Sequence, residues 1–134
     1  MNPGDLLANR FQIEALAGEG GMGSVYRAHD RRTDRSVAIK LLRHPSSHTE
    51  RFSREARVLA GLEHPGIVAY VDHGTTEDGK PYLAMEWLDG ESLRTRLSRT
   101  GLTIEESIEV VRRAADALAV AHARGFVHRD LKPD

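Results

Sequence analysis

Apolar and polar residues alternate over several short stretches in the first part of the chain. Phe11, Ile13 and Ala15 alternate with their neighbours in an imperfect period of two, which is typical of a strand. Further runs with strand character, separated by turn residues, cover residues 24–28, 36–42, 67–71 and 82–87. Residues 1–10 show no such pattern and are interpreted as a polar lead. The pattern therefore predicts five strands before residue 90.

Helical spacing interrupts this series once, between the third and fourth predicted strands. Phe52, Ala56 and Leu59 lie at intervals that place them on one face of a helix, and Gly61 is expected to end it. The apolar face of such a helix needs a cover, and the predicted sheet is the nearest one. The first ninety residues are therefore expected to form one helix packed on a sheet.

The second part of the chain is helical. A short helix is predicted over residues 91–99, and a longer one begins at Thr103, where Glu106 follows at the spacing of a capping box. The longer helix carries one apolar stripe that ends near Gly125 and comprises Ile104, Ile108, Val111, Ala115 and Leu118. We interpret the stripe as a core face, and we expect it to be exposed in a chain of this length, because no further helix is left to cover it.

Composition narrows the class of protein. The chain has 134 residues, 40% hydrophobic and 29% charged, with a formal net charge of −1. This balance fits one small soluble domain and excludes both an acidic disordered tail and a basic nucleic-acid coat, so no nucleic-acid partner is expected. Cysteine is absent, which excludes disulfides, zinc–thiolate sites and thiol catalysis. The start lacks the apolar region of a signal peptide and no apolar run reaches ~18 residues, so the expected location is cytoplasmic, without a membrane segment.

A glycine cluster with the pattern G-x-G-x-x-G follows the first predicted strand. It runs through Gly18, Glu19, Gly20, Gly21, Met22 and Gly23. Alone it is weak evidence, because glycine-rich loops are common. A dinucleotide-binding cluster opens a helix, whereas here a strand follows, which favours a hairpin that lays its backbone N–H groups over phosphates. A Walker loop is excluded because no Gly-Lys-Ser/Thr occurs.

A lysine and a glutamate follow in positions that suit a phosphate site. On the strand that contains Val37-Ala38-Ile39-Lys40, the small Ala38 and Lys40 share one face, which could hold a flat ring and phosphates. Lysine is rare here, since only three of the 19 basic residues are lysines, and its compact charge suits a phosphate. Glu55 lies on the predicted helix, and a carboxylate facing the sheet would need Lys40 as partner. The alternatives are a solvated lysine and a solvated glutamate.

The ordered motifs resemble the first half of a protein kinase domain of the bacterial Ser/Thr type. They are GEGGMGSV, VAIK, the helix with Glu55, HPGIV at 64–68, YLAMEWLDG at 82–90 and HRDLKPD at 128–134. The resemblance implies an α+β, protein-kinase-like fold, with a five-stranded antiparallel sheet and one helix followed by the first helices of a helical lobe. The implied divisions are a lead at 1–10 and a partial kinase domain at 11–134, with an N-lobe at 11–86, a hinge at 87–90 and the start of the C-lobe at 91–134.

The same resemblance implies a role for each matching residue. The loop from Gly18 to Gly23 would cover the phosphates of ATP, Lys40 held by Glu55 would bind the α and β phosphates, and Asp130 would take or orient the proton of the substrate hydroxyl. Lys132 would neutralise the transferring phosphoryl group. The adenine pocket would be formed by Val25 and Ala38 as its roof, Met85 at its back, and the backbones of Glu86 and Leu88 at its edge. The implied activity is phosphoryl transfer from MgATP to a Ser or Thr hydroxyl of a protein.

Two departures from the kinase pattern leave another function open. The residue before the first glycine is Ala17, where the family usually has a larger aliphatic side chain. The magnesium-binding asparagine and the Asp-Phe-Gly site do not occur in the 134 residues, so ATP and Mg²⁺ are the expected cofactors although the protein ligands for the metal are missing. No metal site is expected from the histidines, because no H-E-x-x-H spacing occurs. The alternative is a non-catalytic nucleotide-binding or interaction module, or a remnant without function.

Overall fold

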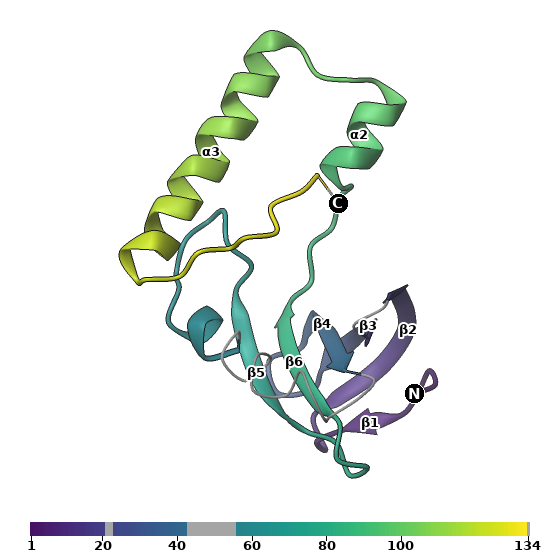
Figure 1. The fold of residues 1–134 in the computed structure, drawn as a ribbon. Coiled ribbons are helices and arrows are strands. Elements are labelled where there is room, and N and C mark those ends of the chain that lie inside the picture. Colours follow the sequence, from purple (N-terminus) through teal and green to yellow (C-terminus); the bar gives the residue numbers. More distant parts are fainter. Residues whose placement is uncertain (21–22, 43–55, 134) are drawn as a thin grey trace. The chain divides into compact units, whose positions relative to one another are not determined.

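The computed structural model describes residues 1–20, 23–42 and 56–133, and within them the chain forms two compact units. The first unit comprises residues 1–61 and 68–87 and holds every strand. The second comprises residues 62–67 and 88–134 and holds helices α2 and α3 (Figure 1). The sequence changes from strand to helix character at the same point, because the alternating pattern ends before residue 90.

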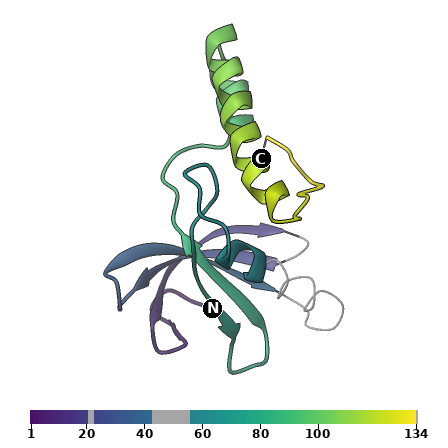
Figure 2. The ribbon, with the colours of Figure 1, turned by 90° about the vertical axis from the view of Figure 1, so that its left-hand side faces the viewer.

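The first unit is built on one antiparallel sheet in which neighbouring strands follow the order β1-β2-β3-β4-β6-β5. Figure 2 shows the strong twist of this sheet. The strands are β1 (Leu6–Leu7), β2 (Phe11–Gly20), β3 (Gly23–Asp30), β4 (Arg35–Leu42), β5 (Tyr70–Thr75) and β6 (Pro81–Glu86). The α+β fold predicted from the sequence is confirmed, with one strand more than the five predicted.

The additional strand comes from the segment predicted as a polar lead. Leu7 pairs with Phe11 across a tight turn in which Ala8 and Asn9 both have positive φ, at 51° and 52°. The amide of Arg10 closes this turn by donating to the Leu7 carbonyl over 3.0 Å. Mirror-image turns of this kind usually contain glycine, and a two-residue strand has no visible alternation, so the sequence pattern gave no sign of β1.

Strand β5 begins later than predicted. The sequence indicated a strand at 67–71, whereas β5 runs over Tyr70–Thr75 and pairs with β6 from Tyr70↔Met85 to Thr75↔Pro81. It contains Asp72 and Gly74, two residue types that are depleted in strands and typical of turns, with His73 between them. An edge strand tolerates them, and here Asp72 and His73 find polar partners.

One side of the sheet holds the larger hydrophobic core. Alternate residues of neighbouring strands point inward, and Phe11 meets Tyr82 edge to face with ring centroids 6.2 Å apart. The buried members of this core are Leu7, Phe11, Ile13, Tyr26, Ala28, Val37, Ile39, Tyr82 and Ala84. The opposite face carries a smaller cluster in which Ala56 packs with Leu42 and Leu83. Residues 56–60 are helical, as predicted, while Phe52 and Glu55 lie outside the described residues.

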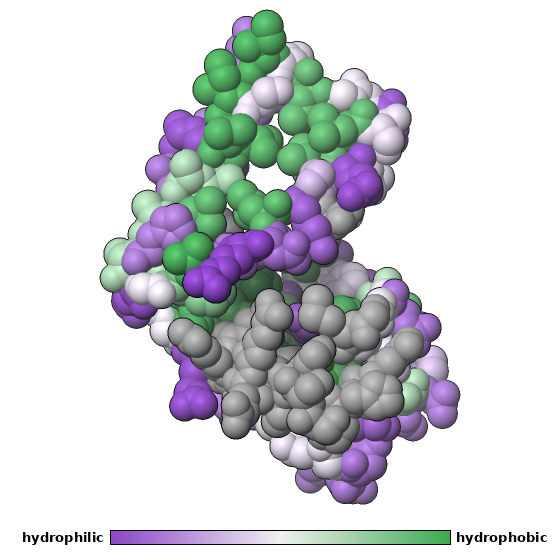
Figure 3. Space-filling model, viewed as in Figure 1, coloured by the Kyte–Doolittle hydropathy of each residue, from purple (hydrophilic) through white to green (hydrophobic). Residues whose placement is uncertain are grey.

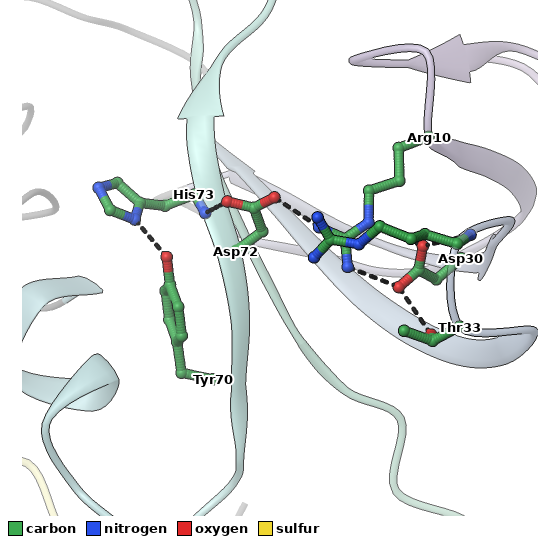
Figure 4. A network of polar contacts seen from close by, with 7 residues as sticks. Arg10, Asp30, Thr33, Tyr70, Asp72 and His73 are labelled. Carbon is green, nitrogen blue, oxygen red and sulfur yellow. Dashed lines mark hydrogen bonds and ion pairs between the residues drawn. The ribbon is translucent and has the colours of Figure 1, made fainter.

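A partly buried arginine joins the two ends of the curled sheet (Figure 4). Arg10 donates from Nε and Nη2 to the two carboxylate oxygens of Asp30 over 2.8 and 2.7 Å, and from Nη1 to Asp72 on β5 over 2.6 Å. Thr33 Oγ1 also donates to Asp30, at 2.7 Å. The hydrogen bonds from Arg10 hold the pKa of the fully buried Asp30 well below its usual range. We refer to Arg10, Asp30 and Asp72 as the Arg10 clasp.

The second unit contains two helices with well-formed ends. Helix α2 spans Leu93–Arg99 and α3 spans Ile104–Ala123. The capping box predicted at Thr103 and Glu106 is present, with each side chain accepting a hydrogen bond from the other residue's backbone N–H. At the far end Gly125, with φ of 74°, donates to His122 and Phe126 donates to Ala121, which is a Schellman motif.

The apolar stripe of α3 is largely uncovered. The side chains of Ile104, Ile108 and Val111 are 76%, 63% and 68% exposed, and Figure 3 shows apolar residues gathered over this helix. The exposure expected from the sequence is therefore observed. Among the described residues, no helix combines the length and the apolar character that crossing a bilayer requires.

Candidate active site

The glycine cluster forms the tip of the β2–β3 hairpin. Gly18, Glu19 and Gly20 end β2, and Gly23 begins β3 directly opposite Gly20. The register shifts between Leu16 and Gly18, so Ala17, where the kinase pattern has a larger residue, lies in an irregular step of the ladder. Gly21 and Met22 lie outside the described residues. The predicted hairpin context of the cluster is present, because a strand and not a helix follows it.

The glycines of the hairpin differ in whether the structure leaves room for a larger residue. Gly23 has φ of 153°, and a Cβ added there would overlap the carbonyl oxygen of Leu41 on β4. A Cβ added at Gly18 or Gly20 would meet no atom of the described residues within 4 Å. Packing among the described residues therefore explains Gly23, whereas it does not explain Gly18 or Gly20.

Four of the predicted pocket residues share one face of the sheet. Val25 on β3 lies opposite Lys40 on β4, and Ala38 on β4 lies opposite Met85 on β6. Directly opposed residues in an antiparallel ladder point to the same side, and so do residues two apart on one strand. Val25, Ala38, Lys40 and Met85 therefore form one surface, which we call the ligand face. Ala38 is buried, and the other three are partly buried.

The last residue of β6 is fixed to the residue before β5. The amide of Glu86 donates to the Ala69 carbonyl over 2.9 Å, and Glu86 Oε1 accepts from the Ala69 amide at 2.8 Å. The first unit ends at Trp87, and Leu88, which belongs to the second unit, is 67% exposed. Glu86 is therefore held by both its backbone and its side chain, next to the point at which the chain leaves the sheet.

Three residues beside the ligand face were not anticipated as part of the site. Arg27 on β3 forms an ion pair with Glu14 over 3.0 Å, and its guanidinium carbon lies 5.3 Å from the centroid of the Trp87 ring. The alternation of β3 already places Arg27 on the same side as Val25, which is the sequence feature that could have drawn attention to it. Its partners could not be found without the strand register.

The predicted catalytic residues lie after α3 in the second unit. Asp130 Oδ2 and Lys132 Nζ are 3.5 Å apart, and both side chains are more than half exposed. The Asp130 amide donates to Nδ1 of His128 over 3.3 Å, and Arg129 between them has φ of 60°. The carbonyl of Pro133 accepts a hydrogen bond from the Arg94 amide in the first turn of α2, at 2.7 Å. The segment is thus attached to α2 through Pro133, and the carboxylate and the ammonium lie side by side.

Other predicted features stay untested by the geometry. Glu55 lies outside the described residues, so its pairing with Lys40 remains a prediction. Across residues 1–20, 23–42 and 56–133, no three His, Asp or Glu side chains gather as a potential metal site. The ligand face belongs to the first unit and the Asp130–Lys132 pair to the second.

Known proteins resemble this chain in both sequence and structure. Residues 11–134 match the family described as the protein kinase domain. The chain is 40% identical to the serine/threonine-protein kinase pkn3 of Myxococcus xanthus over 98% of its own length and 25% of the relative. It is 41% identical to the serine/threonine-protein kinase PknA of Mycobacterium tuberculosis, over 97% of this chain and 32% of the relative.

The crystal structure of the M. tuberculosis PknI kinase domain superposes with a TM-score of 0.85 at 30% identity, covering 99% of this chain and 55% of that domain. The chain thus spans about a quarter to a third of the curated relatives and about half of the solved kinase domain. All three relatives are bacterial, and those named by activity are serine/threonine kinases. With nearly its whole length matched, the chain belongs to the protein kinase domain family.

Proposed function

We propose that this chain is the nucleotide-binding part of an ATP-dependent serine/threonine protein kinase, whose complete form transfers the γ-phosphoryl group of MgATP to a protein hydroxyl. The observation that carries the proposal is the ligand face, on which Val25, Ala38, Lys40 and Met85 lie together beside the glycine hairpin. Family membership supports the same activity.

In the proposed nucleotide site, adenine and the phosphates contact two different kinds of surface. The small side chain of Ala38, with Val25 and Met85 around it, offers a flat apolar area for adenine. Lys40 provides a point charge for the α and β phosphates. Gly18 and Gly20 leave the backbone of the hairpin open to approach, which suits phosphates lying against N–H groups. The backbones of Glu86 and Leu88 would meet the adenine edge.

The proposed transfer step uses the Asp130–Lys132 pair. The hydroxyl oxygen of the substrate forms a bond to the γ phosphorus while the bond from that phosphorus to the β–γ bridging oxygen breaks, and ADP leaves. The hydroxyl proton passes to the carboxylate of Asp130, and the ammonium of Lys132 offsets charge on the transferring group. Magnesium would be held by the phosphates of the nucleotide, because the described residues gather no cluster of His, Asp or Glu side chains that could bind it.

The experiment is a comparison of binding and transfer in the complete protein that contains this chain. Asp130→Asn should lower the rate of phosphate transfer to a Ser/Thr protein by about 10³-fold or more while the Kd for MgATP changes little, because the variant loses the proton acceptor and keeps the ligand face. Transfer and binding lost together would contradict these roles. Tight MgATP binding without any transfer by the wild-type protein would favour the non-catalytic nucleotide-binding module.

A further inference from the structure

One arginine lies at the centre of a row of polar and aromatic contacts that crosses the sheet. The Arg27 Nε atom lies 3.0 Å from Glu14 Oε2 on β2, and its Nη2 atom donates to Ser36 Oγ on β4 over 3.3 Å. The guanidinium carbon lies 5.3 Å from the centroid of Trp87, which follows β6. The planar group is therefore oriented by two polar partners and presented to the aromatic ring within cation–π range.

This row lies on the ligand face and not on the core side of the sheet. Arg27 is opposite Ala38 in the β3–β4 ladder and two residues from Val25 along β3. Side chains two apart on a strand point to the same side. Arg27 therefore borders the area proposed for adenine, whereas Lys40, opposite Val25, marks the area proposed for phosphates.

Trp87 lies in the segment whose backbone is proposed to contact adenine, directly after β6. It lies between Glu86 and Leu88, whose backbone groups are proposed to meet the adenine edge. It is also the last residue of the first unit before the chain passes to the second. Glu86 is fixed on one side by its two hydrogen bonds with Ala69. The contact with Arg27 supplies a second fixed point, one residue further along.

We propose that Arg27 is a positioning residue that holds Trp87 against the sheet and thereby sets the backbone of residues 86–88 for an adenine ring. This inference rests on the proposed nucleotide-binding function and adds a residue to that site. Arg27 would act through Trp87 and would not touch the phosphates. Its loss should therefore weaken binding of the neutral adenosine part and leave binding of a triphosphate group unchanged.

The first test measures whether Arg27 covers the ring, and it needs no ligand. Trp87 is the single tryptophan of the chain, so its fluorescence reports this position alone. Acrylamide quenching should increase in Arg27→Gln, and to a smaller degree in Glu14→Gln, because the guanidinium loses a partner that orients it. Arg35→Gln is the matched control, since Arg35 is an exposed arginine on β4 and the variant removes the same charge. An unchanged quenching constant in Arg27→Gln would overturn the proposal.

The second test measures binding by calorimetry with two probes, adenosine and inorganic triphosphate, on the 134-residue chain. Arg27→Gln should weaken adenosine binding by about two- to fivefold, the range expected for one exposed cation–π contact, with triphosphate binding as in the wild type. Arg27→Lys keeps the charge but not the planar guanidinium. Its affinity for adenosine should therefore lie between those of the wild type and Arg27→Gln.

The other outcomes are distinguishable from this one. Weaker triphosphate binding with unchanged adenosine binding would mean that Arg27 acts as a charge, which overturns the proposal. An equal loss of both, together with a lower thermal midpoint, would mean a general structural role and would also overturn it. If the wild-type chain binds neither probe, the proposed function fails, and the quenching comparison still decides whether Arg27 holds Trp87.

Discussion

Val25 and Lys40 lie directly opposite each other on β3 and β4, so that an apolar side chain and an ammonium group stand next to each other on one face of the sheet. The pair therefore places an apolar surface suited to an aromatic ring beside a positive charge suited to phosphates. Lys40→Met should raise the Kd for ATP by about tenfold or more, because a hydrogen bond between charged groups is lost. Calorimetric titration measures it.

Lys80→Met is the matched control for this variant. Lys80 is another of the three lysines, and it pairs with Asp78 in the turn before β6, over 2.5 Å. The control removes the same charge from the same unit, and its Kd for ATP should equal that of the wild type. Equal losses in the two variants would mean that general charge, and not the position of Lys40, governs binding.

Substitutions at two glycines of the β2–β3 hairpin should affect different properties, one the stability of the fold and the other the binding of ATP. Gly23→Ala forces a Cβ against the Leu41 carbonyl at a φ that L-residues avoid, so the free energy of unfolding should fall by about 1–3 kcal/mol. Gly18→Ala meets open space and should leave stability nearly unchanged while weakening ATP binding. Denaturant titration and calorimetry on the two variants provide the comparison. A destabilised Gly18→Ala would show that packing, and not ligand approach, requires that glycine.

Removing the guanidinium of the Arg10 clasp should greatly lower the free energy of unfolding. Arg10→Met leaves the fully buried Asp30 without its main partner, and breaking a buried ion pair from one side costs about 3–5 kcal/mol. The free energy of unfolding from denaturant titration measures this loss. Arg113→Met on α3 is the control, because its ion pair with Glu109 lies at the surface, where such pairs contribute little. Similar small effects in both variants would contradict a structural role for the clasp.

The clasp should also make stability depend on pH in the acid range. The pKa of Asp30 is lowered from its ordinary value of 3.8, chiefly by hydrogen bonds from Arg10. A carboxyl group with a depressed folded pKa stabilises the fold fully above its unfolded pKa, and the contribution is lost as the pH falls through the folded pKa. The urea midpoint should therefore decrease as the pH falls below about 4. In Asp30→Asn the midpoint should be lower at neutral pH and vary less with acid.

The exposed stripe of α3 should make the 134-residue chain associate. Ile104, Ile108 and Val111 present a continuous apolar surface, and such surfaces bind apolar dyes and each other. Replacing Ile108 and Val111 with lysine should reduce dye fluorescence and shift the chain toward monomer in light scattering. The charge-matched control adds lysines at Ala119 and Ala123, two exposed positions of α3 outside the stripe. A wild-type chain that is monomeric and binds no dye would contradict the expectation.

Sequence patterns correctly predicted those features that depend on residues close together in the chain. The ends of α3 followed from Thr103, Glu106 and Gly125, because capping depends on residues within one turn. The shared face of Ala38 and Lys40 followed from the alternation within one strand, whereas the strand register adds Val25 and Met85 to it. In contrast, β1 depends on a turn formed by Ala8 and Asn9, and this pair is not a typical sequence signal for a hairpin.

Long-range contacts set the remaining features, and the sequence pattern could not supply them. Strand β5 contains turn-like residues that are stable there because Asp72 reaches Arg10, 62 positions earlier in the chain. The contact between Arg27 and Trp87 likewise depends on the order of three strands, β3, β4 and β6. Neither could be deduced from spacing along the chain.

The Arg10 clasp also determines where the domain can be cut. The family match begins at Phe11, so an expression boundary chosen from that match would omit Arg10. The shortened chain would keep both carboxylates and lose the group that neutralises them, and β5 would lose its attachment to the start of the sheet. The ten residues before the family match thus contribute strand β1 and the arginine of the clasp to the sheet, and we expect their removal to lower the free energy of unfolding.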